Sequence, residues 1–174
     1  MADILKTTIT LVLSNFPLAT LLAGVLVALA ALGRAPRPVG RAVVVEKLLA
    51  WHVFFAIGVG YLYNFVCHVF FGRFTAAYIG WADSPFQVEV GTASLGFALV
   101  GFLAAFRSFD LRLAAVLGSA VFLLGAAAGH LWQMVTTHNF APGNAGSIFY
   151  TDIAVPLFGL ALLWLQHRWG RPPA

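Results

Sequence analysis

Five polar side chains interrupt long apolar stretches of this 174-residue sequence: His68, Glu89, His130, Gln133 and Asp152. Ionisable groups inside apolar segments are costly to bury, so each one marks a candidate functional position. Imidazoles and carboxylates can ligate a metal ion, hydrogen-bond a small ligand or transfer a proton. Arg73 joins this set because it lies a few residues beyond His68 and could hold an anionic group.

The spacing of these residues predicts that they share one pocket. They lie one or two helical turns from the same end of four apolar segments, with His130 and Gln133 on the same segment, so they are expected at similar depth. Residues three and four apart share a helix face. Three such faces are predicted, which comprise Tyr61, Asn64 and His68; Glu89, Thr92, Ala93 and Gly96; and Ala126, His130, Gln133 and Thr137.

Four interpretations of this cluster remain open. A divalent metal would be held by His68, Glu89, His130 and Asp152. A pocket for a small lipophilic molecule, such as a quinone, would be lined by His68, Arg73, Glu89, His130, Gln133 and Asp152. Haem b would take His68 and His130 as axial ligands. A network that only stabilises the structure is the fourth interpretation.

The elements that must position these side chains are membrane-spanning helices. Hydrophobic residues make up 61% of the chain and charged residues only 9%, far fewer charges than a soluble, disordered or nucleic-acid-binding protein carries. A spanning helix needs about 20 mostly apolar residues. The sequence predicts an all-α bundle of five such helices over residues 10–32, 48–71, 86–106, 111–135 and 148–166, within one domain of residues 1–174.

The basic residues predict the orientation of the chain. Eight Lys and Arg side chains fall at one end of the predicted helices and only Lys6 and Arg73 at the other. Positive charges favour the cytoplasmic side, which places the N-terminus outside and the C-terminus in the cytoplasm of a multi-pass protein of the cell (inner or plasma) membrane. Between the helices, residues 72–85 are expected to form an interfacial segment. Residues 138–146 are expected to form an outer loop in which His138, Asn139 and Asn144 serve folding.

Two stretches resemble a family of small prokaryotic integral membrane proteins of unknown function. One runs from Phe71-Gly72-Arg73-Phe74 through Trp81 to Gly91, and the other runs from Gly129-His130 through residues 139–146 to Tyr150-Thr151-Asp152. The resemblance implies no known activity. It marks six positions of the family pattern, Gln87, Glu89, His130, Asn139, Asn144 and Asp152. The chain is more loosely similar to DoxX-like membrane proteins, which are short helical bundles, some linked to quinone or sulfur redox chemistry.

Three classes of function compete on this sequence. The first is ligand or metal binding, with redox or proton-transfer chemistry at the polar cluster. The second is a non-enzymatic membrane subunit that assembles with itself or with another membrane protein. The third is transport, which is disfavoured for a monomer because the five segments show no internal repeat. Membrane lipid is the one partner that the composition itself predicts, and nucleic acid is not expected.

Overall fold

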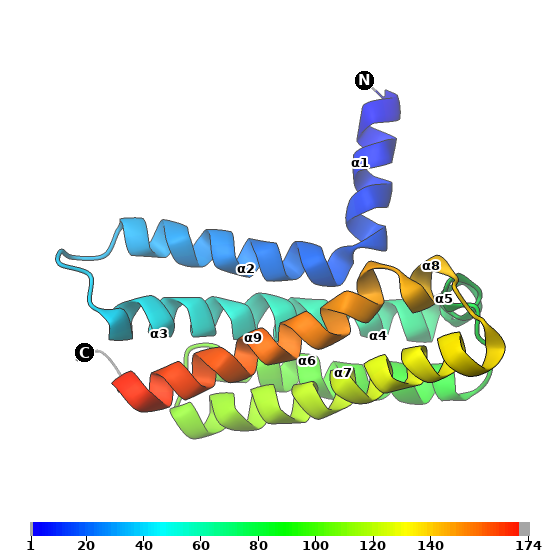
Figure 1. The fold of residues 1–174 in the computed structure, drawn as a ribbon. Helices are drawn as coiled ribbons and strands as arrows, with labels where there is room; N and C mark the ends of the chain where they lie inside the picture. The colour runs from blue at the N-terminus through cyan, green and yellow to red at the C-terminus, as the bar shows by residue number, and fades with distance from the viewer. Residues whose placement is uncertain (1, 171–174) are drawn as a thin grey trace.

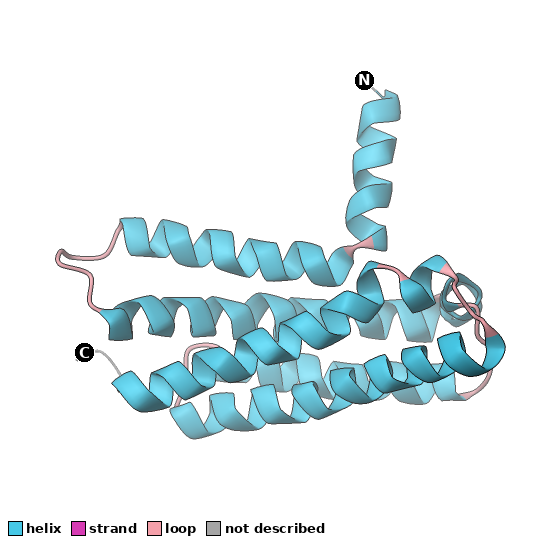
Figure 2. Cartoon of the chain, viewed as in Figure 1, coloured by secondary structure: helices cyan, strands magenta, loops and turns pink. Residues whose placement is uncertain are grey.

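The computed structural model describes residues 2–170 as a helical bundle (Figures 1 and 2). The helices within this range are α1 (Ala2–Ser14), α2 (Phe16–Gly33), α3 (Arg41–His52), the π-helix η1 (Val53–Val59), α4 (Gly60–Phe70), α5 (Gly72–Ile79), α6 (Phe86–Ala104), α7 (Phe109–Thr137), α8 (Pro142–Ala145) and α9 (Ser147–Trp169). Helices α3, η1 and α4 follow one another without a break. Arg171 and the side chain of Lys6 lie outside the described part of the chain.

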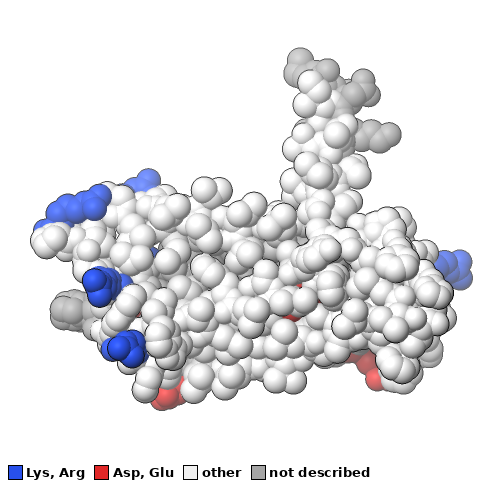
Figure 3. Space-filling view, in the orientation of Figure 1, with Lys and Arg blue, Asp and Glu red and all other residues white. Residues whose placement is uncertain are grey.

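Five helical segments between residues 2 and 170 are long and apolar enough to cross a membrane, as predicted. They are Phe16–Gly33, Arg41–Phe70, Phe86–Ala104, Phe109–Thr137 and Pro142–Trp169. In Figure 1 they run roughly alongside one another, with α5 and α8 together at one end of the bundle and the α2–α3 connection at the other. Most Lys and Arg side chains in Figure 3 gather at the end of the α2–α3 connection.

The first spanning helix begins at Phe16 rather than at residue 10. The Asn15 side chain donates a hydrogen bond from Nδ2 to the carbonyl of Leu11, which satisfies a group at the end of α1. Pro17 occupies the first turn of α2, where the absence of its N–H costs nothing. The chain therefore turns at residues 14–17, and α1 projects at a steep angle from the bundle (Figure 1).

Small residues bring the second and third spans into close contact. A Cβ atom added to Gly101 on α6 would lie 2.7 Å from the backbone nitrogen of Gly58 in η1. The buried face of α6 continues this pattern through Gly91, Ser94 and Ala98. Small side chains at helix interfaces let backbones approach closely, and packing of this kind drives helix association where hydrophobic burial cannot.

A buried ion pair joins three spans at the end that carries most of the basic residues. The guanidinium of Arg112, which is 1% exposed, donates to both carboxylate oxygens of Glu46, with Nη1–Oε2 and Nη2–Oε1 distances of 2.8 and 2.7 Å. Gln166 on α9 also donates to Glu46, and Nε of Arg112 lies 3.4 Å from the carbonyl of Ala104. Arg112 lies in the first turns of α7, because Ser108 caps that helix.

We expect Arg112→Leu to destabilise the bundle strongly. It leaves the Glu46 carboxylate without its bidentate partner, a change that costs about 3–5 kcal/mol in the free energy of unfolding. The double variant Glu46→Leu/Arg112→Leu removes both charges and should recover much of this loss. Thermal unfolding in detergent measures both variants, and a double variant less stable than Arg112→Leu would contradict the assignment.

Candidate functional site

A cavity of about 650 Å³ lies among α4, α6, α7 and α9, in the half of the bundle near α5 and α8. Its wall is mostly apolar and aromatic, with Phe86, Phe122 and Val155 among the lining residues. Trp81 and Ala82 from the loop that follows α5 also line it. A cavity of this size is typical of sites that bind small molecules.

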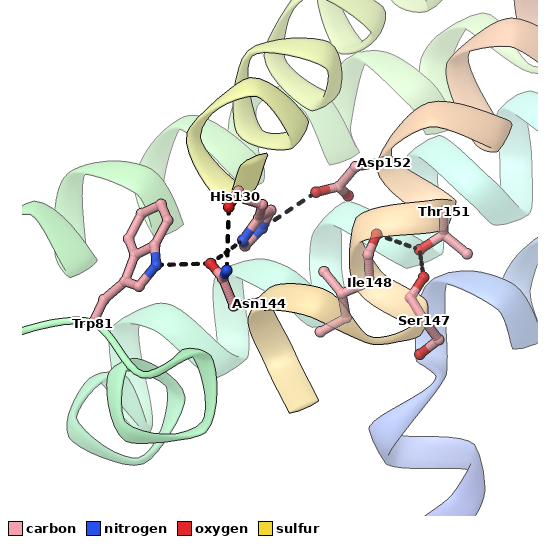
Figure 4. A network of polar contacts seen from close by, with 7 residues as sticks. All are labelled: Trp81, His130, Asn144, Ser147, Ile148, Thr151 and Asp152. Carbon is pink, nitrogen blue, oxygen red and sulfur yellow. Dashed lines mark hydrogen bonds and ion pairs between the residues drawn. The ribbon is translucent and has the colours of Figure 1, made fainter. Parts of the chain in front are cut away.

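Asn144 in α8 organises the polar end of this cavity (Figure 4). Its side chain is fully buried. The amide nitrogen Nδ2 donates to the carbonyl of His130 at 3.2 Å and to the carbonyl of Asn139 at 2.9 Å. The amide oxygen Oδ1 accepts from Nε1 of Trp81 at 3.0 Å and lies 2.8 Å from Nδ1 of His130. One side chain therefore ties the end of α7 to the loop after α5.

A glycine holds this loop against the turn that follows α7. Gly80 has φ +76°, in the left-handed region that favours glycine, and a Cβ there would lie 2.7 Å from Oδ1 of Asn139. Nδ2 of Asn139 donates to the carbonyls of Ile79 and Gly80. The two outer connections thus form one hydrogen-bonded layer, and this layer places Trp81 over the cavity.

Asp152 in the second turn of α9 faces His130. Its Oδ2 lies 3.5 Å from Nε2 of His130, and both side chains are less than a tenth exposed. Figure 4 shows the carboxyl group on the far side of the imidazole from Asn144. Pro156, one turn further along α9, lacks an N–H, so it cannot donate to the carbonyl of Asp152. The His130–Asp152 pair places two ionisable groups side by side on the cavity wall.

Three other polar residues of the lining have protein partners. The hydroxyl of Tyr61 donates to the carbonyl of Ser119 at 2.9 Å, and Nδ2 of Asn64 donates to Oγ of Ser94 at 2.8 Å. Nδ1 of His68 lies 2.6 Å from Oε1 of Gln87. The stripe Tyr61, Asn64 and His68 lies on the cavity side of α4, as its spacing predicts.

The structure brings together three of the six predicted site residues: His68, His130 and Asp152 all line the cavity. Glu89 and Arg73 are exposed, and neither lines it. Gln133 is half-buried and accepts a hydrogen bond from the Thr137 hydroxyl instead. Glu89 points outward with Thr92, Ala93 and Gly96 because α6 packs through its opposite, small-residue face, so the predicted inward stripe of this helix is wrong.

The donor sets predicted for metal and haem do not assemble in the described part of the chain. No group of three or more His, Cys, Asp and Glu side chains among residues 2–170 is placed to hold a metal ion. Glu89, the predicted fourth ligand, lies on the outside of α6. Nδ1 of His130 is hydrogen-bonded to Asn144, and Nε2 lies 3.5 Å from Oδ2 of Asp152, so a haem iron on Nε2 would have to displace the carboxyl group.

Two residues that organise the site were not predicted to belong to it. Asn144 was assigned to folding of the outer loop, and Trp81 was not considered a site residue. The proximity of each to His130 depends on how the two outer connections fold together, which helical periodicity does not encode. The signal that pointed to Asn144 was its place in the family pattern given above.

We expect Asn144→Asp to weaken the fold at the outer end. The change keeps an acceptor near Trp81 and His130, but its second oxygen would face the carbonyls of His130 and Asn139 without a proton to donate. A buried group left unsatisfied costs about 1–3 kcal/mol. Thermal unfolding should therefore show a lower midpoint for Asn144→Asp, whereas Asp83→Asn in the exposed loop nearby should leave it unchanged. An unchanged midpoint in both variants would contradict the assigned network.

Comparison with known proteins identifies the family but not an activity. No curated protein and no solved structure matches the chain. One family model, the family of unknown function DUF6790, matches residues 14–172, which include all five candidate spans and the whole cavity. The match begins at the end of α1, so this projecting helix lies outside the shared region. The chain belongs to the family of unknown function DUF6790.

Proposed function

We propose that this membrane protein binds a small lipophilic molecule in the cavity among α4, α6, α7 and α9. The observation that carries this proposal is the composition of the wall, which is apolar except for a few polar groups at defined places. Binding sites for small molecules combine apolar walls with a few polar groups that fix orientation. Most of the contact area favours an apolar molecule, and the His130–Asp152 pair provides a polar anchor.

Entry from the lipid phase suits this arrangement. Several lining residues are also exposed on the outside of the bundle, including Ala82, Phe86 and Gly125. The cavity therefore reaches the surface beside them. A molecule dissolved in the membrane would reach the polar pair without crossing the aqueous phase, and its apolar part would stay in contact with apolar side chains throughout.

Filling the cavity should abolish binding. Ala126 on α7 lines the cavity, whereas Ala128 on the same helix is exposed on the outside of the bundle. We expect Ala126→Phe to lower the affinity for a hydrophobic probe such as pyrene by at least about tenfold, because the ring occupies the space the probe requires. Ala128→Phe is the matched control and should bind like the wild type. Fluorescence titration in nanodiscs measures both.

The proposal would be contradicted by equal binding to Ala126→Phe and to the wild type, or by no binding above that of empty nanodiscs. Mass spectrometry of lipids that remain with the purified protein provides a second measurement. A small lipophilic molecule retained by the wild type and by Ala128→Phe, but lost from Ala126→Phe, would identify the natural ligand directly.

We further infer that the cavity lies in the outer half of the cytoplasmic membrane. Arg34, Arg37, Arg41 and Arg168 lie at the end of the bundle opposite the cavity. Basic residues favour the cytoplasmic side, which supports an N-terminus outside. In this orientation the layer formed by α5, α8 and the connecting loops covers the outer end of the bundle.

Cysteine labelling tests the orientation. Cys67 is half-buried in α4, so a Cys67→Ser background removes the natural thiol. Asp83→Cys in the exposed loop after α5 should react with a membrane-impermeant maleimide in intact cells. Pro36→Cys in the α2–α3 connection should react only after the cells are permeabilised. Labelling of residue 36 but not residue 83 in intact cells would show that the chain has the opposite orientation.

A further inference from the structure

The hydrogen bonds of Asn144 determine which nitrogen of His130 carries a proton. Nδ2 of Asn144 faces two backbone carbonyls, which only accept hydrogen bonds, so the amide nitrogen must be on that side. The amide oxygen then accepts from Trp81, whose indole N–H only donates. The same oxygen lies 2.8 Å from Nδ1 of His130, so Nδ1 must carry a hydrogen.

This arrangement makes Nε2 of His130 an acceptor in the neutral ring. Nε2 faces Oδ2 of Asp152, and an acceptor opposite an ionised carboxylate would be repulsive. The pair therefore requires one proton. If this proton is on Asp152, a neutral imidazole lies beside a carboxylic acid. No charge is then placed in the apolar wall, where burial of charge is costly. The two groups then present one acceptor, Nε2, and one donor, the acid O–H, at the same place.

The spacing of the pair leaves both groups available to a ligand. The Nε2–Oδ2 distance of 3.5 Å exceeds the usual N···O hydrogen-bond range of about 2.7–3.2 Å. An oxygen atom from the cavity can lie within hydrogen-bond distance of both atoms at once. Among the other polar lining groups, Tyr61, Asn64 and Nδ1 of His68 are hydrogen-bonded to protein groups.

We propose that the cavity selects lipophilic alcohols, with the ligand hydroxyl donating to Nε2 of His130 and accepting from the carboxylic acid of Asp152. This inference rests on the proposed lipophilic ligand and names its chemical class. A hydroxyl group is both donor and acceptor, so it satisfies both members of the pair. A ketone satisfies only the acid and leaves Nε2 unpaired, and a hydrocarbon satisfies neither. Asn144 and Trp81 act as positioning residues because they fix the ring of His130.

Three probes with one carbon skeleton test this selectivity: cyclododecanol, cyclododecanone and cyclododecane. Isothermal titration of the full chain in nanodiscs, with empty nanodiscs subtracted, gives the affinity of each. We expect the alcohol to bind about tenfold more tightly than the ketone, since one buried group left unpaired is enough to produce this difference. The hydrocarbon should bind most weakly.

The outcomes separate this inference from the broader proposal. Equal affinities for all three probes, or tighter binding of the ketone, would overturn selection of alcohols while leaving a lipophilic binding site in place. Failure of all three probes to bind would overturn the lipophilic site and the alcohol selectivity together.

Substitution of the acid provides a matched pair of variants. Asp152→Leu removes the donor but leaves Nε2 of His130 as an acceptor, so the preference for cyclododecanol over cyclododecane should become smaller. Glu89→Leu makes the same kind of change on the exposed face of α6 and should leave the preference intact. If Glu89→Leu loses the preference while Asp152→Leu retains it, the assignment of the pair is wrong.

Spectroscopy of the wild type tests the protonation states of His130 and Asp152 without relying on the binding behaviour of a variant. In protein labelled with ¹⁵N-histidine, the His130 signals are those absent from a His130→Gln sample. They should show a neutral ring protonated at Nδ1, and cyclododecanol should perturb Nε2 more strongly than Nδ1. The infrared C=O band of a protonated carboxyl group should shift with the same probe. An imidazolium, or a ring protonated only at Nε2, would overturn the inference.

Discussion

Hydrocarbon offers no hydrogen-bond partners, and this constraint explains the positions of nearly all the polar side chains inside the bundle. At one end, Glu46 receives Arg112 and Gln166 from two other spans. At the other end, Asn144 joins Trp81 and His130. One cluster is ionic and the other is built on an amide. Between them α6 packs through glycine, serine and alanine, and the hydrogen bonds from Tyr61 to Ser119 and from Asn64 to Ser94 join further pairs of spans.

Much of the fold followed from the sequence because the relevant signals were redundant. Five long apolar segments predicted five helices, and five helical segments among residues 2–170 could cross a membrane. On α4 the polar residues Tyr61, Asn64 and His68 all share one face, so periodicity alone could orient that helix. His130 and Asp152 were found because an ionisable group inside an apolar segment stands out against any background.

Other features could not be predicted because competing signals were present. On α6, Glu89 suggested one inward face, while the small residues Gly91, Ser94 and Ala98 mark the face that is buried. The small-residue face is the buried one because it allows close helix packing, and the Glu89 carboxylate remains exposed near the end of the helix. The ion pair between Glu46 and Arg112 was not predicted. Their pairing depends on the mutual placement of α3 and α7, which no local pattern records.

The π-helix η1 affects how the side chains of α3 are oriented relative to those of α4. A π-helical turn accommodates about one more residue than an α-helical turn, so it offsets the faces of the helix on either side. Each residue advances an α-helix by about 100°. An ordinary α-helix with the same number of residues over Val53–Val59 would rotate Glu46 by about 100° relative to Tyr61 and His68, whereas an α-helix one residue shorter would keep them on nearly the same faces. A relative one residue shorter in this segment would therefore bring the same side chains together with an ordinary α-helix, whereas a chain of the present length needs the wide turn to do so.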